Sequence, residues 1–296
     1  MLSFDKTPIQ EIEDPILVEK QIRLSIKRED LLHPFIKGNK WYKLKYNIEE
    51  AEKQKKKQIL TFGGAYSNHI YATASAGQAL GLQTIGIIRG EEVLPLNPIL
   101  AHAESCGMKL FYLDRANYRL KHTEVIIKKL EGEFGDFYLI PEGGTNEYAV
   151  RGASEILKEI GEGYDYVCCA CGTGGTLAGL IASTKIHVIG FSVLKGSFLT
   201  MEVNYLLEKV IEKKLLTDFF SLPTHWEINE QYHFGGYAKA TEELLTFVSD
   251  FNQKYQIPIE PVYTGKLFYG IFDLIKKNHF APHTHILAIH SGGVYP

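Results

Sequence analysis

Short apolar runs rich in β-branched residues alternate with longer amphipathic segments along most of this sequence. The runs predicted to form strands are Ile59–Phe62, Thr84–Ile88, Lys109–Leu113, Phe137–Ile140, Tyr166–Cys171, His187–Val193 and Thr284–His290. The intervening segments have apolar residues at helical spacing, and in the first of them Trp41, Leu44 and Ile48 fall on one face. Strands that alternate with helices form βαβ units and parallel sheets. The sequence therefore predicts an α/β fold, with mostly parallel, twisted sheets flanked by helices.

Helix periodicity and chain length together predict two lobes. The predicted helices are Trp41–Lys56, Tyr71–Leu80, Asn97–Cys106, Tyr118–Leu130, Ala149–Ile160, Leu177–Thr184, Phe198–Lys213, Thr241–Tyr255 and Leu267–Lys277. A chain of 296 residues is long for one compact domain and comfortable for two. Turn-like boundaries lie at Lys45–Asn47 and Pro141–Asn146. We therefore expect a small domain, residues 46–146, inserted into a large domain made of residues 1–45 and 147–296.

Composition and charge exclude some classes of function. A net charge of -3 gives no reason to expect binding to nucleic acid. No apolar run approaches the roughly 20 residues that span a bilayer. The first residues lack the basic region and apolar core of a signal peptide. We therefore expect a cytoplasmic protein.

Three of the four cysteines lie in one apolar run, at Cys168, Cys169 and Cys171. This is not the spacing of a zinc site, and no second pair follows downstream. In a strand, Cys169 and Cys171 would face one side and Cys168 the other. We expect small core residues and no metal site.

A lysine stands at the start of the first long helix, in the sequence Gly38-Asn39-Lys40. The positive end of a helix dipole disfavours an ammonium group and favours a free amine. A free amine is what covalent attachment of a carbonyl compound requires. Lys43, one turn further on, is the rival for this role, and a solvated surface lysine is the plain alternative.

Two glycine-containing turns each join a predicted strand to a predicted helix. Thr61–His69 reads TFGGAYSNH, which suits either an anion site for a carboxylate or an ordinary Ser or Asn helix cap. Cys171–Gly179 reads CGTGGTLAG, whose backbone N–H groups suit one phosphate. The second turn has neither the dinucleotide spacing nor a Walker lysine. No basic residue stands within it, so we expect N–H groups and the helix dipole to bind the phosphate almost unaided.

Two further polar turns, PVYTGK at Pro261–Lys266 and HSGG at His290–Gly293, follow later in the chain. Ligands in open α/β sheets bind beyond the carboxyl ends of strands, where such turns gather. Together and in this order, the segments resemble the fold-type II pyridoxal-phosphate enzymes, whose fold is that of tryptophan synthase β. Within them, the D-cysteine desulfhydrase and 1-aminocyclopropane-1-carboxylate deaminase group is the most similar. The matching stretches are KREDLL at Lys27–Leu32, GNKWYKL at Gly38–Leu44, GGAYSNH at Gly63–His69, GTGGTLAGL at Gly172–Leu180, PVYTGK, and HSGGV at His290–Val294.

The resemblance implies which residues bind pyridoxal 5'-phosphate. Lys40 would attach it, Asn68 would bind its ring hydroxyl, and Thr264 would face its pyridine nitrogen. The phosphate would lie on Thr173, Gly174, Gly175 and Thr176. A hydroxyl supplies no compensating negative charge, so Thr264 would leave the ring nitrogen largely unprotonated.

The resemblance also implies catalytic roles. Lys40 would move the α-proton, and Ser67 would hold the substrate or assist proton transfer. Tyr263 would be a second acid or base, with Tyr237 as the other active-site tyrosine. The sequence departs from the family at Lys37, where a glycine is usual, at Tyr42, where an arginine is usual, and at Pro296, where the family has a longer tail.

The resemblance implies a homodimer and a lyase that performs α,β-elimination on a small amino acid such as D-cysteine. A thiolate leaves more easily than hydroxide, which suits a modest electron sink. The alternatives are the ring-opening deaminase, an amino-acid racemase, a non-catalytic binder of the cofactor, and a nucleotide-binding α/β protein that holds no such cofactor.

Overall fold

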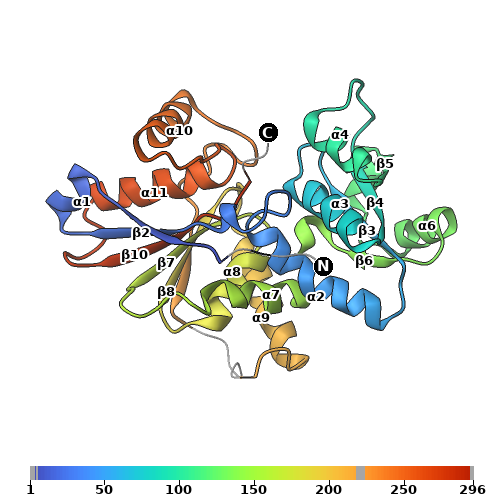
Figure 1. Ribbon diagram of the computed structural model, residues 1–296, viewed down its shortest axis with the longest axis horizontal. Helices are drawn as coiled ribbons and strands as arrows, with labels where there is room; N and C mark the ends of the chain where they lie inside the picture. The colour runs from blue at the N-terminus through green and yellow to red at the C-terminus, as the bar shows by residue number, and fades with distance from the viewer. Residues whose placement is uncertain (1–3, 5, 218–223, 294–296) are drawn as a thin grey trace.

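The computed structural model describes residues 4, 6–217 and 224–293, and its strands form two sheets (Figure 1). The large sheet has the order β1(Ile9–Ile12)-β2(Arg23–Lys27)-β10(His285–Ile289)-β7(Tyr166–Cys171)-β8(His187–Ser192)-β9(Trp226–Asn229). The small sheet has the order β5(Lys109–Leu113)-β4(Gln83–Arg89)-β3(Gln58–Gly63)-β6(Tyr138–Ile140). Among these described strands only β1 and β2 pair antiparallel. The predicted α/β fold with mostly parallel sheets is confirmed.

The sequence prediction missed three strands of the large sheet, β1, β2 and β9. Strands β1 and β9 lie at the sheet edges and are only partly buried, so they carry no continuous apolar run. Strand β2 is buried, but it includes Lys27, whose Nζ lies 2.9 Å from a Glu29 carboxylate oxygen. A buried charge that is paired breaks the apolar pattern without breaking the strand.

Helices cover both faces of each sheet. They are α1(Pro15–Lys20), α2(Asn39–Lys53), α3(Asn68–Leu80), α4(Pro98–Ser105), α5(Arg115–Arg119), α6(Glu124–Phe134), α7(Glu147–Ala153), α8(Gly175–Ser183), α9(Leu199–Glu212), α10(Glu242–Tyr255) and α11(Thr264–Lys276), with short 3₁₀ turns at Glu29–Leu31, Glu142–Gly144 and Ser154–Leu157. The helix predicted over Tyr118–Leu130 is wrong, because a turn at Leu120–Thr123 separates α5 from α6. Likewise, α7 ends at Ala153 and tightens into a 3₁₀ turn, where Ser154 donates to the Arg151 carbonyl.

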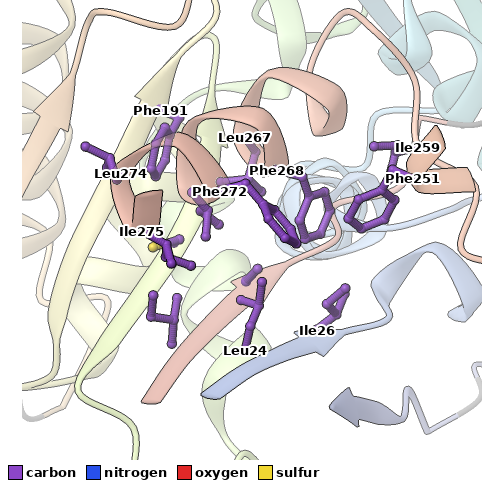
Figure 2. Packing of buried hydrophobic residues seen from close by; sticks show 14 of the residues in the cluster. Leu24, Ile26, Phe191, Phe251, Ile259, Leu267, Phe268, Phe272, Leu274 and Ile275 are labelled. Carbon is purple, nitrogen blue, oxygen red and sulfur yellow. The ribbon is translucent and has the colours of Figure 1, made fainter. Parts of the chain in front are cut away.

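The large sheet has an apolar core on each face. On one face Phe268 and Phe272 of α11 pack over Leu24, Ile26 and other strand residues (Figure 2). Burial of one such side chain contributes about 1.5–3 kcal/mol. Cys168 belongs to this core, whereas Cys169 and Cys171 belong to the core beneath α7, α8 and α9. The predicted alternation of the cysteines is therefore confirmed.

Helix α2 joins the two sheets. Its Leu44 and Ile48 belong to the core of the small sheet, while its backbone lies against α7 of the large sheet. The close approach requires Gly152, because a Cβ there would lie 1.7 Å from the Tyr42 carbonyl oxygen. The predicted boundary after residue 45 falls inside this continuous helix. The domain limits stay a prediction, but α2 holds Lys40 between the two sheets.

Candidate active site

A cavity of about 270 Å³ lies where both sheets present the carboxyl ends of their strands. Its lining contains nearly all of the residues predicted to act: Lys40, Ser67, Asn68, Thr173, Gly174, Gly175, Thr176, Tyr237 and Tyr263. These residues come from five separate segments of the sequence. The exception is Thr264, which is fully buried behind the wall. The fold therefore brings the predicted constellation together.

The backbone of the Gly38-Asn39-Lys40 turn packs directly against that of the HSGG turn, His290–Gly293. The Gly38 backbone has φ +60°, and a Cβ there would lie 1.8 Å from the Ser291 carbonyl oxygen. Only glycine satisfies both conditions. The Asn39 N–H donates to the same carbonyl at 3.2 Å. The first turn of α2, which carries Lys40, is therefore held in a fixed position. The glycine that must be kept is Gly38, whereas position 37 accommodates the Lys37 side chain.

The amine of Lys40 donates to Asn39 Oδ1 at 2.6 Å. Burial lowers the pKa of Lys40 to about 8, although the Glu260 carboxylate opposes this by raising it. The sequence predicted a lowered pKa from the helix dipole, whereas the larger cause is loss of hydration. Near neutral pH the amine is therefore uncharged far more often than that of a solvent-exposed lysine.

Lys43 occupies a different part of the same cavity. It is 3% exposed, and its Nζ donates to Thr145 Oγ1 at 2.8 Å. Burial, and next the charge of Lys40, hold the pKa of Lys43 well below its usual value. Its Cε lies 3.2 Å from the position that a Cβ of Gly175 would take. The two lysines share a helix face, but Lys43 lies at the glycine-rich turn between β7 and α8.

That turn forms an open helix start. Gly174 is the N-cap of α8 with φ +81°, and no side chain caps the helix. The first N–H groups of a helix need partners, and an anion satisfies them well. Thr176 is held from the other side, because Asn39 Nδ2 donates to its Oγ1 at 2.7 Å. The side chain of Lys43 also stands beside the turn, although it lies outside the loop in the sequence. That the phosphate needs little help from a basic side chain stays a prediction.

The turn between β3 and α3 is different. Ser67 is the N-cap of α3, and its Oγ accepts from the Ile70 N–H at 3.4 Å. Behind it, Thr61 Oγ1 lies 2.8 Å from His69 Nε2 and donates to the Ile140 carbonyl at 2.8 Å. Since the Thr61 hydrogen is used, His69 Nε2 must donate and Nδ1 must be an acceptor. Within the described chain this Nδ1 has no hydrogen-bond partner.

Helix α11 is capped by Glu260, a residue that none of the sequence motifs contains. Its Oε1 accepts from the Tyr263 and Thr264 N–H groups, each at 2.9 Å. Its Oε2 accepts from the Val262 N–H at 2.6 Å. The Thr264 hydroxyl lies 3.2 Å from Glu260 Oε1 and accepts from the Glu260 N–H at 3.0 Å.

A carboxylate, that of Glu260, therefore stands directly beside the Thr264 hydroxyl. Glu260 does not line the cavity, and its oxygens are occupied by backbone N–H groups and by Thr264. Ser291, by contrast, does line the cavity. The role of Thr264 at the ring nitrogen stays a prediction.

Two tyrosines form a further wall. The rings of Tyr237 and Tyr263 meet edge to face, with centroids 6.0 Å apart. Burial, followed by the neighbouring Tyr237, raises the pKa of Tyr263 well above its usual value. The Tyr237 loop is held by Lys266, whose Nζ donates to the carbonyls of His233 and Gly236 at 2.9 and 2.8 Å. Tyr263 therefore stays protonated and can donate a hydrogen bond into the cavity.

The sequence model of the pyridoxal-phosphate dependent enzyme family matches residues 2–292. The chain belongs to this family. A Pyrococcus abyssi protein provisionally named 1-aminocyclopropane-1-carboxylate deaminase is 32% identical, covering 98% of this chain and 89% of that protein. The bifunctional D-cysteine desulfhydrase/1-aminocyclopropane-1-carboxylate deaminase of Arabidopsis thaliana is 30% identical, over 92% of this chain and 72% of that protein.

Among solved structures, that of an ACC deaminase homologue superposes with a TM-score of 0.85 and 31% identity, covering 98% of this chain and 90% of that one. The resemblance inferred from the motifs is therefore confirmed, including fold type II and the cofactor.

The cavity residues fit pyridoxal phosphate. The uncapped start of α8 offers N–H groups to a phosphate, and the Lys43 amine lies beside it, where the negative charge of a phosphate would favour the protonated form. Lys40 and Asn68 also line the cavity, where Lys40 would supply an amine for attachment and Asn68 an amide for the ring hydroxyl. Among the residues that the structure describes, no three His, Cys, Asp or Glu side chains gather where they could hold a metal ion.

Proposed function

We propose that this enzyme catalyses α,β-elimination from a β-substituted D-amino acid such as D-cysteine, giving pyruvate, ammonia and the leaving group. The observation that carries this proposal is the meeting of Lys40, Tyr263 and the open α8 start in one cavity. The cofactor, when bound, supplies an electron sink that makes the substrate Cα–H acidic. The chain then needs only a base, an anion site and a route for the leaving group.

Lys40 is the base. With its pKa lowered to about 8 by burial, the amine can take a proton from Cα near neutral pH. Tyr263 acts as a donor rather than a base, because its raised pKa keeps the hydroxyl protonated. Ser67, at the start of α3, helps to hold the substrate carboxylate, while Asn68 binds the cofactor ring hydroxyl. We propose that only the D enantiomer directs Cα–H to Lys40, a preference that rests on the family resemblance.

The leaving group decides between substrates. At the wall where we place the ring nitrogen, Ser291 lines the cavity and Glu260 does not, because the Glu260 carboxylate caps α11. A hydroxyl supports a weaker electron sink than a carboxylate does, so the β-substituent must leave easily. A thiolate, whose conjugate acid has a pKa of about 8.5, leaves far better than hydroxide, whose conjugate acid is water at about 15.7. D-Cysteine and β-chloro-D-alanine should therefore react faster than D-serine.

Ring-opening deamination of 1-aminocyclopropane-1-carboxylate is the second candidate. The names of the Pyrococcus and Arabidopsis relatives favour it. That substrate has no α-hydrogen and needs a stronger sink, so Thr264 and Ser291 argue against it. Measurable 2-oxobutyrate from 1-aminocyclopropane-1-carboxylate would place this activity ahead of elimination.

A coupled pyruvate assay on both enantiomers of cysteine, β-chloroalanine and serine tests the proposal. We expect pyruvate from the D-thiol and D-chloro substrates. If these amino acids change the cofactor spectrum without releasing pyruvate, elimination is wrong. Interconversion of enantiomers would then indicate a racemase, and its absence a non-catalytic binder. A colourless protein that fails to take up pyridoxal phosphate would point to the nucleotide-binding alternative.

We further propose a homodimer in the cytoplasm that acts on small amino acids and binds no nucleic acid. The support is the family resemblance together with the net charge of -3. In the described part of the chain, no helix combines the length and apolar character needed to cross a membrane. Light scattering of the purified enzyme tests the dimer, because a molar mass near one chain would contradict it.

A further inference from the structure

A cationic side chain that no motif includes enters the cavity from the small sheet. Arg89 is the last residue of β4, and it lines the cavity. Strand β4 pairs with β3 so that Ile88 lies opposite Gly63. Arg89 therefore stands next to Gly64, and its Nη2 lies 3.5 Å from the position that a Cβ of Gly64 would take. The guanidinium thus borders the loop that leads to Ser67 and Asn68.

Arg89 has no anionic partner among the described residues. Its guanidinium carbon lies over the Tyr118 ring, 5.9 Å from the centroid. The carboxylate that shares this wall, Glu142, accepts from Tyr118 Oη at 2.9 Å and pairs with Lys121 at 3.2 Å. A guanidinium is charged at every physiological pH and matches the geometry of an acid group. The cavity therefore presents a cation whose charge the protein leaves available.

The other positive groups of the cavity already have assignments. The start of α8 and Lys43 suit the cofactor phosphate, Lys40 suits its attachment, and the start of α3 suits the substrate carboxylate. Arg89 is therefore free to bind a second negative charge on the substrate, in addition to the α-carboxylate. Resting on the proposed function, we infer that Arg89 selects amino acids whose β-substituent carries its own acid group. An acidic thioether of D-cysteine is the simplest member of this class.

The reaction balances for such a substrate. The Cα–H bond breaks and its proton passes to Lys40, while the Cβ–S bond breaks and its electron pair leaves with the acidic thiolate. Water then replaces the nitrogen, giving pyruvate and ammonia, and the thiolate takes up the proton. The acid group on sulfur is unchanged, so Arg89 binds it without taking part in bond breaking.

The test uses two thioethers that differ only in charge. S-Carboxymethyl-D-cysteine ends in an acid, and S-carbamoylmethyl-D-cysteine ends in the isosteric amide. Each is offered to the cofactor-loaded enzyme, with binding followed by cofactor absorbance and turnover by pyruvate. A charge-assisted hydrogen bond should favour the acid by on the order of tenfold in Kd and in kcat/KM. Arg89→Gln should remove this preference, and Arg89→Lys should keep part of it.

Arg115→Gln is the matched control, because it removes one exposed positive charge from α5 that does not line the cavity. The control should keep the full preference for the acid. Equal binding of acid and amide by the unaltered enzyme would overturn the inference. Equal weakening of both thioethers by Arg89→Gln would also overturn it, by assigning Arg89 to the α-carboxylate. If the acid binds better but no substrate yields pyruvate, the proposed elimination fails while the role of Arg89 stands.

Discussion

The two turns that lead from a buried strand to a buried helix are alike in sequence and different in how they start the helix. Between β3 and α3, Ser67 gives its side chain to the Ile70 N–H, so part of the helix start is already satisfied. Between β7 and α8, Gly174 offers no side chain, and Lys43 and Thr145 stand alongside. The N-terminus of α3, where one N–H group already has a partner, should bind an anion more weakly. That suits a substrate carboxylate, which must leave after each turnover. An open start with a cation beside it suits a resident phosphate.

The strongest way to break this comparison is to fill the open turn. At Gly175 a Cβ would meet Thr145 at 3.1 Å and Lys43 at 3.2 Å, tighter than ordinary contact. Gly175→Val should therefore weaken pyridoxal-phosphate binding by on the order of a hundredfold, because it blocks the approach of the phosphate to the N–H groups. Gly64→Ala is the counterpart in the other turn, where the nearest atom is 3.5 Å away.

Equilibrium dialysis against pyridoxal phosphate measures both variants. Gly64→Ala should bind the cofactor within about twofold of the unaltered enzyme, since ordinary van der Waals contact needs no rearrangement. Full retention of cofactor by Gly175→Val, at low free pyridoxal phosphate, would show that the wrong turn was assigned to the phosphate.

A smaller change tests the cation beside the open turn. Lys43→Met keeps most of the side-chain volume and removes the charge. A hydrogen bond to a charged group is worth about 1.5–3 kcal/mol, so cofactor Kd should rise by roughly 10- to 100-fold. Lys45→Met is the control, because Lys45 pairs with Glu155 outside the cavity. If both variants bind cofactor equally well, Lys43 has no part in holding the phosphate.

Removing the cap of α3 should affect stability more than cofactor binding. Ser67→Ala deletes the acceptor for the Ile70 N–H, and loss of an N-cap costs about 1 kcal/mol. Urea unfolding of the apoenzyme should show this loss, and Ser67→Thr should recover most of it. A Ser67→Ala variant that loses cofactor rather than stability would reverse the roles given to the two turns.

The smallest expected effect concerns Glu260. Attachment of pyridoxal phosphate needs the uncharged Lys40 amine, so its rate should rise with pH and level off above about 8, the lowered pKa of Lys40. The Glu260 charge raises that pKa, so a neutral glutamine should move the midpoint to lower pH. Stopped-flow absorbance across pH measures this for Glu260→Gln, with Glu260→Asp as the charge-preserving control. A midpoint that moves to higher pH would contradict the electrostatic link.

Local motifs in the sequence were enough to predict the strands around the cavity and many of the residues that line it. The strand-to-helix turns could be predicted locally, because glycines and capping residues indicate where a parallel strand ends and the next helix begins. What could not be predicted depends on residues far apart in the sequence. Lys43 and Thr145 are 102 positions apart, yet they form one hydrogen bond beside the β7–α8 turn.

Glu260 illustrates a second limit. Its sequence context, just before PVYTGK, signals a turn but not that both carboxylate oxygens cap α11. Arg89 illustrates a third, because a charged residue ending a strand is usually solvated. Only the pairing of β4 with β3 places it against the loop that precedes Ser67.

Which lysine carries the cofactor is the central question, because the two turns are assigned around it. Borohydride reduction of the loaded enzyme, followed by peptide mapping, answers it directly. We predict a pyridoxyl group on Lys40 with Lys43 unmodified. A pyridoxyl group on Lys43, with Lys40 unmodified, would contradict the account of both turns.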